Sequence, residues 1–369
     1  MWGGTLIDGT GAPPLPDAVL VVDAAGRLAC AGGAGACAEP PDARRVDATG
    51  FWIIPGLLDV DVPPPAGEAA DVVERRARLR FLLGVTTERV WYADPTRRAE
   101  AAGSVARTEG RPVPRRIVRA PAGLSRLVAL DEIPPDAPPA AWAARGVWLE
   151  PRLLRRELRV EPYRLSVGLH RLLELPWLVA ALRTGSPAGS EPAGGAEGAP
   201  ADTGRARAEL GRARAWVREY HAAGGKVVTG SGGVLAPGLS ILAEMRALVT
   251  AGLAPEAALA AATREAAAAI GVSDSLGTLV PGKLADFVVL EGDPLADIRN
   301  AEIVSRVAKG GVLHDPAGLF EDLKDDLSDR ASSRGPRLLL GLLAMLSTLG
   351  ALAWAVRRHR ASLPASRRA

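Results

Sequence analysis

Short segments in which apolar and polar positions alternate occupy the first 54 residues of the chain and return near residue 290. A period of two is typical of β-strands with one buried face, and glycine-rich turns between the segments predict hairpins. The predicted strands are residues 5–7, 18–22, 27–29, 51–54, 287–290 and 304–308. Because two distant sets of strands can complete one small layer structure, residues 1–54 and 268–316 are predicted to form a composite β-sandwich.

Between these two sets of strands, helix-like and strand-like segments alternate. The predicted elements are a helix at 69–83 that ends at Gly84, strands at 85–90 and 146–150, a charged helix at 205–223 and a strand at 226–229. Alternation of this kind predicts βα units and a parallel sheet or barrel over residues 55–267. Within that region, residues 184–204 are rich in Gly, Ala, Pro and Ser and predict a flexible loop.

A long apolar run marks the C-terminal part of the chain. Residues 338–356 carry no charged side chain and would span about 28 Å as a helix, close to a bilayer core. They predict a transmembrane helix, a lipid-bilayer partner and a membrane localisation; a buried core helix is the alternative. Residues 317–337 form a polar linker and 357–369 a basic tail. The absence of a signal-peptide pattern favours a cytoplasmic body, whereas the more basic tail favours the opposite orientation.

Composition narrows the possible functions. The 369 residues are 48% hydrophobic, which is enough for a large core, and the formal net charge is +3. Arginines are spread among acidic residues rather than clustered with aromatic ones, so no nucleic-acid partner is predicted. Cys30 and Cys37 do not have metal-site spacing; small buried thiols are predicted, with a disulfide between them as the alternative.

Several short motifs occur together in the order found in one known family. They are GTLIDGTG at 4–11, PGLLD at 55–59, GVTT at 84–87 and GTLVPGKLADFVVL at 277–290. Together they resemble amidohydrolases of the imidazolonepropionase and prolidase-like type, and the resemblance covers most of residues 3–315. It implies a (β/α)8 barrel flanked by the composite β-sandwich, and metal-dependent hydrolysis of carbon–nitrogen bonds. The barrel is expected to be degenerate, because the region between its first and last motifs is short for eight βα units.

The resemblance also implies where a metal centre would lie. In the family, a His-x-His pair follows strand 1, a carboxylated lysine often follows strand 4, histidines follow strands 5 and 6, and an aspartate follows strand 8. Here the His-x-His positions are Asp61 and Pro63, the aspartate position is Gly232, and no lysine precedes Lys226. The family metal site is therefore predicted to be lost, with no catalytic residue, metal or cofactor expected.

A rearranged site is the alternative. Asp59, Asp61 and Glu150 lie at or near predicted strand ends, and three acids without nitrogen ligands would suit a hard cation such as magnesium. Zinc or another divalent metal would be the cofactor under this alternative. His170 is the remaining candidate nitrogen ligand, although its surroundings predict a helix. The other histidines, His221, His314 and His359, fall outside the predicted ends of the barrel strands.

Three functional hypotheses follow from these residues. The leading one is a membrane-anchored amidohydrolase homologue that is a catalytically inactive pseudoenzyme with a binding or scaffold role. The second is an active hydrolase for non-peptide or dipeptide-like carbon–nitrogen bonds, with a rearranged metal site. The third is a binding protein whose barrel mouth holds a small molecule. Retained fold motifs do not decide among them, because function depends on the site.

Overall fold

The computed structural model describes residues 1–62, 70–90, 116–118, 127–160, 203–234, 237–316 and 318. The chain divides into two compact units, Met1–Leu319 and Phe320–Ala369, and every described residue belongs to the first. Several predicted features lie outside the described residues: Pro63, His170, His359, residues 184–202 of the predicted loop and the apolar run 338–356. The last two positions of that loop, 203 and 204, begin a helix.

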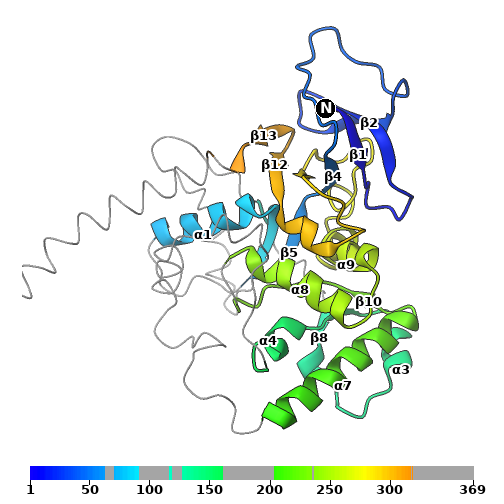
Figure 1. The fold of residues 1–369 in the computed structure, drawn as a ribbon, viewed down its shortest axis with the longest axis vertical. Helices are drawn as coiled ribbons and strands as arrows, with labels where there is room; N and C mark the ends of the chain where they lie inside the picture. The colour runs from blue at the N-terminus through cyan, green and yellow to red at the C-terminus, as the bar shows by residue number, and fades with distance from the viewer. Residues whose placement is uncertain are drawn as a thin grey trace, which may run out of the picture. The chain divides into compact units, whose positions relative to one another are not determined.

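A seven-stranded sheet joins the two ends of the first unit (Figure 1). In spatial order it contains β13 (Val312–His314), β12 (Val304–Lys309), β11 (Phe287–Leu290), β4 (Trp52–Pro55), β1 (Trp2–Leu6), β2 (Leu15–Val22) and β3 (Leu28–Gly33). The N-terminal and C-terminal sets meet where β4 pairs antiparallel with β11, with Phe287 opposite Pro55. Apolar side chains from both sets, including Leu20, Ile53 and Phe287, share one core. The strands predicted from alternation are therefore present, in a single sheet.

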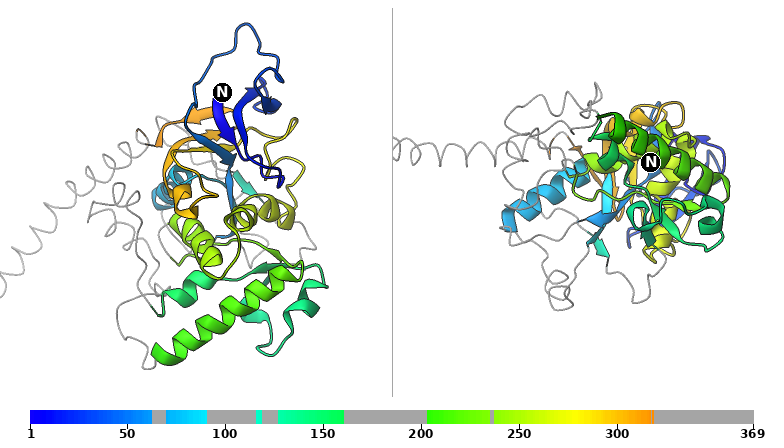
Figure 2. Two further views of the ribbon diagram at one scale, coloured as in Figure 1. Left: turned by 45° about the vertical axis from the view of Figure 1, so that its right-hand side comes forward. Right: turned by 90° about the horizontal axis from the view of Figure 1, so that it is seen from below.

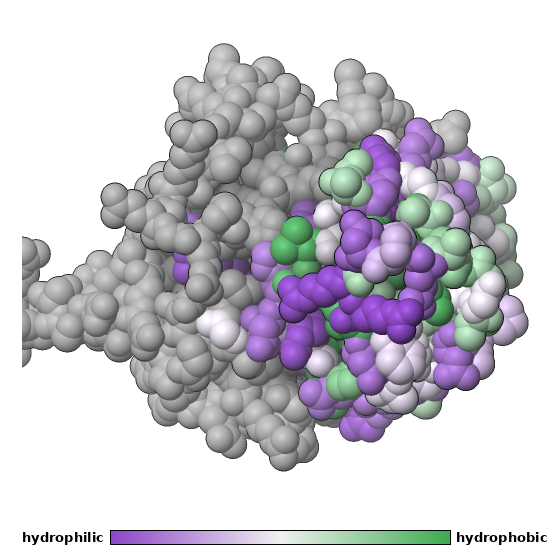
Figure 3. Space-filling model, turned by 90° about the horizontal axis from the view of Figure 1, so that it is seen from above, coloured by the Kyte–Doolittle hydropathy of each residue, from purple (hydrophilic) through white to green (hydrophobic). Residues whose placement is uncertain are grey.

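The end of the first unit that carries β1 and β2 has a mixed surface. Figure 3 shows hydrophilic side chains over most of the described part of this face, with apolar ones scattered among them. The exposed large apolar residues of the described chain, Trp2, Leu15 and Val312, all belong to the strands of this sheet. Apolar residues scattered singly in this way are ordinary on a protein surface.

Parallel strands form the second part of the unit. One group is β5 (Leu57–Val62), β6 (Val85–Val90) and β7 (Arg116–Val118); the other is β10 (Lys226–Val227), β9 (Trp148–Glu150) and β8 (Leu127–Ala129). The amide of Val60 donates to the carbonyl of Thr229, 3.4 Å away, so β5 lies beside the segment that follows β10. The described strands thus run in the order β7, β6, β5, β10, β9, β8, with the first and last barrel-type strands adjacent.

Residues 119–126 separate β7 from β8 and lie outside the described part of the chain. The degeneracy of the barrel therefore stays a prediction. At another junction, α1 (Ala70–Leu82) ends where predicted: Gly84 has φ +84°, and a Cβ there would lie 2.9 Å from Val288 Cγ2.

Helices cover the parallel strands and supply most of the apolar core. α8 (Leu239–Thr250), α9 (Pro255–Ala262) and α10 (Arg264–Ala269) follow β10, and α8 is buried along nearly its whole length. α7 (Thr203–Ala222) packs along α3 (Pro139–Ala143) and α4 (Leu153–Glu157) (Figure 2). Its buried residues recur at helical spacing: Ala206, Leu210, Ala213, Val217 and Tyr220. The Tyr220 hydroxyl donates to Val147 O at 2.7 Å, which satisfies a buried polar group.

The predicted transmembrane helix is corrected by the structure. Within the described ranges, no helix combines the length and the apolar composition that a bilayer crossing requires. α7 has 20 residues, but its exposed positions include Arg205, Arg207 and Arg212, which make it an amphipathic surface helix. The predicted membrane localisation is corrected together with that helix, and residues 338–356 themselves lie outside the described part of the chain.

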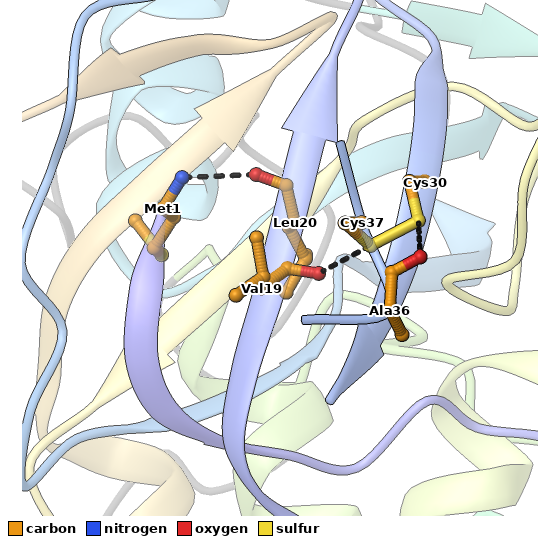
Figure 4. The surroundings of a disulfide bond; sticks show 6 residues. All are labelled: Met1, Val19, Leu20, Cys30, Ala36 and Cys37. Atoms are coloured by element: carbon orange, nitrogen blue, oxygen red, sulfur yellow. Dashed lines mark hydrogen bonds between the residues drawn. A yellow bond between two sulfur atoms is a disulfide. The ribbon is translucent and has the colours of Figure 1, made fainter. Parts of the chain in front are cut away.

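The cysteines form a disulfide, which corrects the prediction of buried thiols. Cys30 lies on β3 and Cys37 on the loop beyond it, with Cα atoms 5.7 Å apart (Figure 4). The two sulfur atoms also contact backbone oxygens, at 3.5 Å from Val19 O for Cys37 and 3.9 Å from Ala36 O for Cys30. In the disulfide neither sulfur carries a hydrogen, so these contacts become S–H···O hydrogen bonds only on reduction.

Candidate functional site

Charged side chains gather where β5, β9 and β10 end. Asp61 lies on β5, Glu150 ends β9, and Ser231 and Gly232 follow β10. The amide of Gly232 and the hydroxyl of Ser231 both donate to Asp61 O, at 2.9 and 3.0 Å. In (β/α)8-barrel enzymes the active site lies at the carboxyl ends of the parallel strands, so this cluster is the candidate functional site.

Arg152 bridges the two acids of the cluster. Its Nη2 lies 2.9 Å from Asp61 Oδ2 and 3.1 Å from Glu150 Oε2. The Arg152 side chain is 24% exposed, Asp61 13% and Glu150 3%, so the contacts are largely shielded from water. Burial opposes the charge of Arg152, but Glu150 and Asp61 outweigh it and raise the pKa of the guanidinium. The arginine therefore stays charged between the two acids.

Glu150 and Arg89 are the most deeply buried charged residues described so far in the candidate site. Burial, followed by the neighbouring Asp61 charge, raises the pKa of Glu150 to about 8 against the opposing effect of Arg152. Arg89 is 1% exposed and donates from Nη1 to Val60 O at 2.9 Å. Burial lowers the pKa of Arg89, while Asp61 and Glu150 act to raise it. Burial and the neighbouring Asp61 charge therefore favour the protonated form of Glu150.

Asp59 holds the strand ends together. It is fully buried, and its Oδ1 accepts hydrogen bonds from the amides of Ser231 at 2.9 Å and Asp61 at 3.2 Å. Burial raises the pKa of Asp59 to about 6, and the charge of Arg80 opposes that rise. These bonds connect β5 to the loop after β10, so the carboxyl group has a structural role in the candidate site.

Gly230 allows the acids to approach that loop. A Cβ at this position would lie 2.2 Å from Glu150 Oε1 and 2.6 Å from Asp61 Cβ. Both distances are shorter than non-bonded contacts allow, so any other residue would push the strand ends apart. Two positions along, a Cβ on Gly232 would lie 3.5 Å from Asp61 Oδ2 and 3.3 Å from Arg155 Nη2. Gly232, at the position where the resemblance implies an aspartate, therefore lies beside Asp61 but has no side chain to bind a metal.

Glu244 positions the segment that carries Arg152. Its buried carboxylate accepts hydrogen bonds from the amides of Leu153 and Leu154, each at 2.8 Å, at the start of α4. Burial raises the pKa of Glu244 to about 7, and the two backbone donors oppose the rise. A carboxylate that caps a helix start satisfies donors that have no partner within the helix.

Replacing Glu244 by alanine should cost about 1–3 kcal/mol of the free energy of unfolding, because it leaves the buried amides of Leu153 and Leu154 without an acceptor. Urea unfolding measures the change, and Glu256→Ala at an exposed position of α9 is the matched control. Equal midpoints for the two variants would contradict a capping role for Glu244.

The structure brings together several residues that the sequence singled out. Asp59, Asp61, Glu150 and Gly232 share the candidate site, whereas Pro63 and His170 lie outside the described residues. His221 lies at the end of α7, with Nδ1 3.4 Å from Gly225 O, and His314 packs against Phe81 with ring centroids 5.1 Å apart. These two histidines therefore belong to other parts of the fold.

Sequence reasoning missed the basic partners and the buried glutamate. Arg89, Arg152 and Glu244 were not predicted as site residues. One signal was available for Arg89, because Glu88 and Arg89 interrupt an otherwise uncharged strand that is buried throughout. Arg152 lies two residues after Glu150, and this spacing alone does not predict that the two side chains contact each other.

The donor set does not fit the metal centre that the resemblance implies. Across the described part of the chain, no three His, Cys, Asp or Glu residues are grouped so that they could hold an ion. Asp61 and Glu150 each direct an oxygen at Arg152. Among the described residues, no imidazole or thiolate is grouped with these acids. Nitrogen and sulfur ligands are those that zinc prefers, and hard cations need six or more oxygens.

Comparison with known proteins shows which family and which solved structures this chain resembles. Residues 136–313 match the model of the amidohydrolase family. Solved structures with the same fold include molinate hydrolase, at 22% identity, with 86% of this chain and 94% of that chain covered and a TM-score of 0.51. An Xaa-Pro dipeptidase with bound methionine matches at 17% identity, 85% and 98% coverage and a TM-score of 0.54. Ochratoxinase from A. niger matches at 18% identity, 85% and 94% coverage and a TM-score of 0.52. Residues 136–313 therefore resemble the amidohydrolase family, and the chain shares the fold of these hydrolases.

Proposed function

We propose that this amidohydrolase-superfamily protein is a pseudoenzyme that keeps the fold for a binding or scaffold role. The observation that supports this most strongly is the contact of Arg152 with both Asp61 and Glu150, at 2.9 and 3.1 Å. In metal-dependent hydrolases, carboxylates at this end of the barrel are available to a cation and to water. Here the two carboxyl groups are occupied by a side chain of the same protein.

The energetic consequence for hydrolysis is large. A catalytic zinc lowers the pKa of its bound water from about 15.7 to about 7, which corresponds to roughly 12 kcal/mol of proton-release free energy. A guanidinium donates hydrogen bonds but offers no coordination position for a water oxygen. Nothing at the described strand ends replaces that effect, so loss of the metal donors removes the main driving force for water activation.

Metal analysis and an activity panel on the same purified protein test this proposal. We expect less than about 0.1 equivalent of zinc, iron, manganese or cobalt per chain, and no hydrolysis of an Xaa-Pro dipeptide, molinate, ochratoxin or simple esters with any of these metals added. The control is a metal-dependent prolidase carried through the same purification. Stoichiometric metal, lost together with a hydrolase activity on chelation and restored with it, would overturn the proposal.

An active hydrolase with a rearranged site remains the second candidate, and one observation favours it. Burial raises the pKa of Asp59 to about 6, and burial together with Asp61 raises that of Glu150 to about 8. Buried carboxyl groups with raised pKa values at a barrel mouth are also found in acid–base catalysts. Asp59, Asp61, Glu150 and His170 would form that site, with a divalent metal as cofactor. Turnover that disappears in Asp61→Ala would select this candidate.

A further inference from the structure

We infer that Arg152 is the resident cation of the barrel mouth and does by ion pairing what a bound metal would otherwise do there, namely hold the ends of β5 and β9 together. The inference rests on the proposed function, because it assumes that no metal competes for Asp61 and Glu150. It assigns a role to a residue that neither the sequence motifs nor the family resemblance singled out.

The first support is the bridging geometry. One guanidinium nitrogen of Arg152 contacts carboxyl groups from two different strands, Asp61 of β5 and Glu150 of β9. Those strands belong to separate three-stranded groups, and the pairing of β9 with β10 does not reach β5 directly. A single cation that binds both acids therefore links the two groups across the mouth, in addition to the backbone contact beside β10.

The second support is the backbone at Arg152 itself. Its φ and ψ are 50° and 40°, in the left-handed region, and Asp17 is the other non-glycine residue with positive φ in the described chain. A non-glycine residue in this region costs free energy that the surrounding structure must supply. Glu244 supplies part of it by binding the two amides that follow, so a buried acid holds the turn that aims Arg152 at the other two acids.

The third support is the arrangement of charge on the opposite side. Arg89 is buried on β6, is anchored to Val60 O, and lies close enough to Asp61 and Glu150 to feel their charge. Isolated charges are strongly disfavoured in such surroundings unless they are paired. Two arginines from different elements thus place positive charge beside the two acids, as a divalent ion would otherwise do.

Thermal unfolding of the full chain tests the assignment without reference to activity. We expect the melting temperature of the unaltered protein to be the same within 1 °C in EDTA, Mg²⁺, Mn²⁺ and Zn²⁺. Arg152→Gln should lower it by about 5–10 °C, because it leaves the shielded Asp61 charge without its partner. Arg155→Gln, three residues along on α4 and bonded only weakly to Gly232 O at 3.4 Å, is the matched control and should lower it by less than about 2 °C.

A double variant separates loss of the ion pair from general damage. Adding Asp61→Asn to Arg152→Gln removes the unpaired charge, so at least half of the lost melting temperature should return. Arg152→Lys keeps the charge but loses the planar fork and should fall between the unaltered protein and Arg152→Gln, which keeps the test usable if Arg152→Gln does not fold.

Two results would overturn the inference. The first is an Arg152→Gln variant no less stable than Arg155→Gln. The second is a saturable rise in the melting temperature of the unaltered protein with a divalent metal, which would also contradict the proposed function. Hydrolysis without metal would contradict the proposed function alone, so the two failures are distinguishable.

Discussion

Replacing Glu150 by glutamine should remove part of the loss of stability that the unaltered protein undergoes as the pH rises from about 5 to 9. The native Glu150 has a pKa raised to about 8, whereas the unfolded chain releases that proton near the ordinary value of 4.5. Between these values the folded state binds more protons than the unfolded state, so stability falls with rising pH. Each pKa unit corresponds to about 1.4 kcal/mol, which makes the total effect several kcal/mol.

Glutamine mimics the protonated acid, so Glu150→Gln should match the unaltered protein near pH 5 and exceed it in stability at pH 9. Urea unfolding at pH 5, 7 and 9 measures the difference. Asp59, with a pKa of about 6, and Glu244, with a pKa of about 7, cause similar losses at lower pH, and these should persist in the variant. Parallel pH profiles for the variant and the unaltered protein would show that Glu150 is not protonated in the folded state near neutral pH.

Replacing Gly230 by alanine should be among the most damaging single-methyl additions in the described chain. The added Cβ would meet Glu150 Oε1 at 2.2 Å and Asp61 Cβ at 2.6 Å. Glu150 can turn aside, but Asp61 Cβ is fixed by the backbone of β5, so β5 and the loop after β10 must separate. Overpacking of this kind costs about 3 kcal/mol, and the separation would also lengthen the Arg152 contacts.

Gly211→Ala is the matched control for Gly230→Ala. Gly211 lies in the middle of α7 on an exposed position, and a Cβ there meets nothing within 4 Å. Alanine should therefore raise the free energy of unfolding by about 0.5–1 kcal/mol, because glycine is the poorer helix former. Calorimetry of both variants measures the contrast. If Gly230→Ala were as stable as Gly211→Ala, the close packing of the strand ends would be disproved.

Local patterns were sufficient for most of the secondary structure. The period-two segments became β1 to β4, β11 and β12, and α1 ends before Gly84, where the sequence predicted. These features depend on neighbours in the chain: which face is apolar, and where a positive φ requires glycine. The order of the parallel strands was not predicted, because periodicity does not report which strands are adjacent.

The predicted membrane helix and the reduced cysteines show where local patterns fail. An apolar run has the same composition whether it packs against lipid or against protein. Hydropathy alone therefore does not distinguish a transmembrane helix from a buried core helix at residues 338–356. The structure finds no bilayer-crossing helix among the described residues. Likewise the spacing of Cys30 and Cys37 left two readings open until the fold placed their Cα atoms 5.7 Å apart.

The sequence alone carried the resemblance to amidohydrolases, the two distant sets of strands and the substitution of metal-ligand positions by Asp61 and Gly232, because motif residues and strand ends are encoded locally. Only the tertiary structure decided what those substitutions mean. Arg89, Arg152 and Glu244 come from β6, the turn after β9 and α8, and nothing in their local sequence joins them. Ion pairing depends on distance in space and on exclusion of water, and both are set by how the strands and helices pack together.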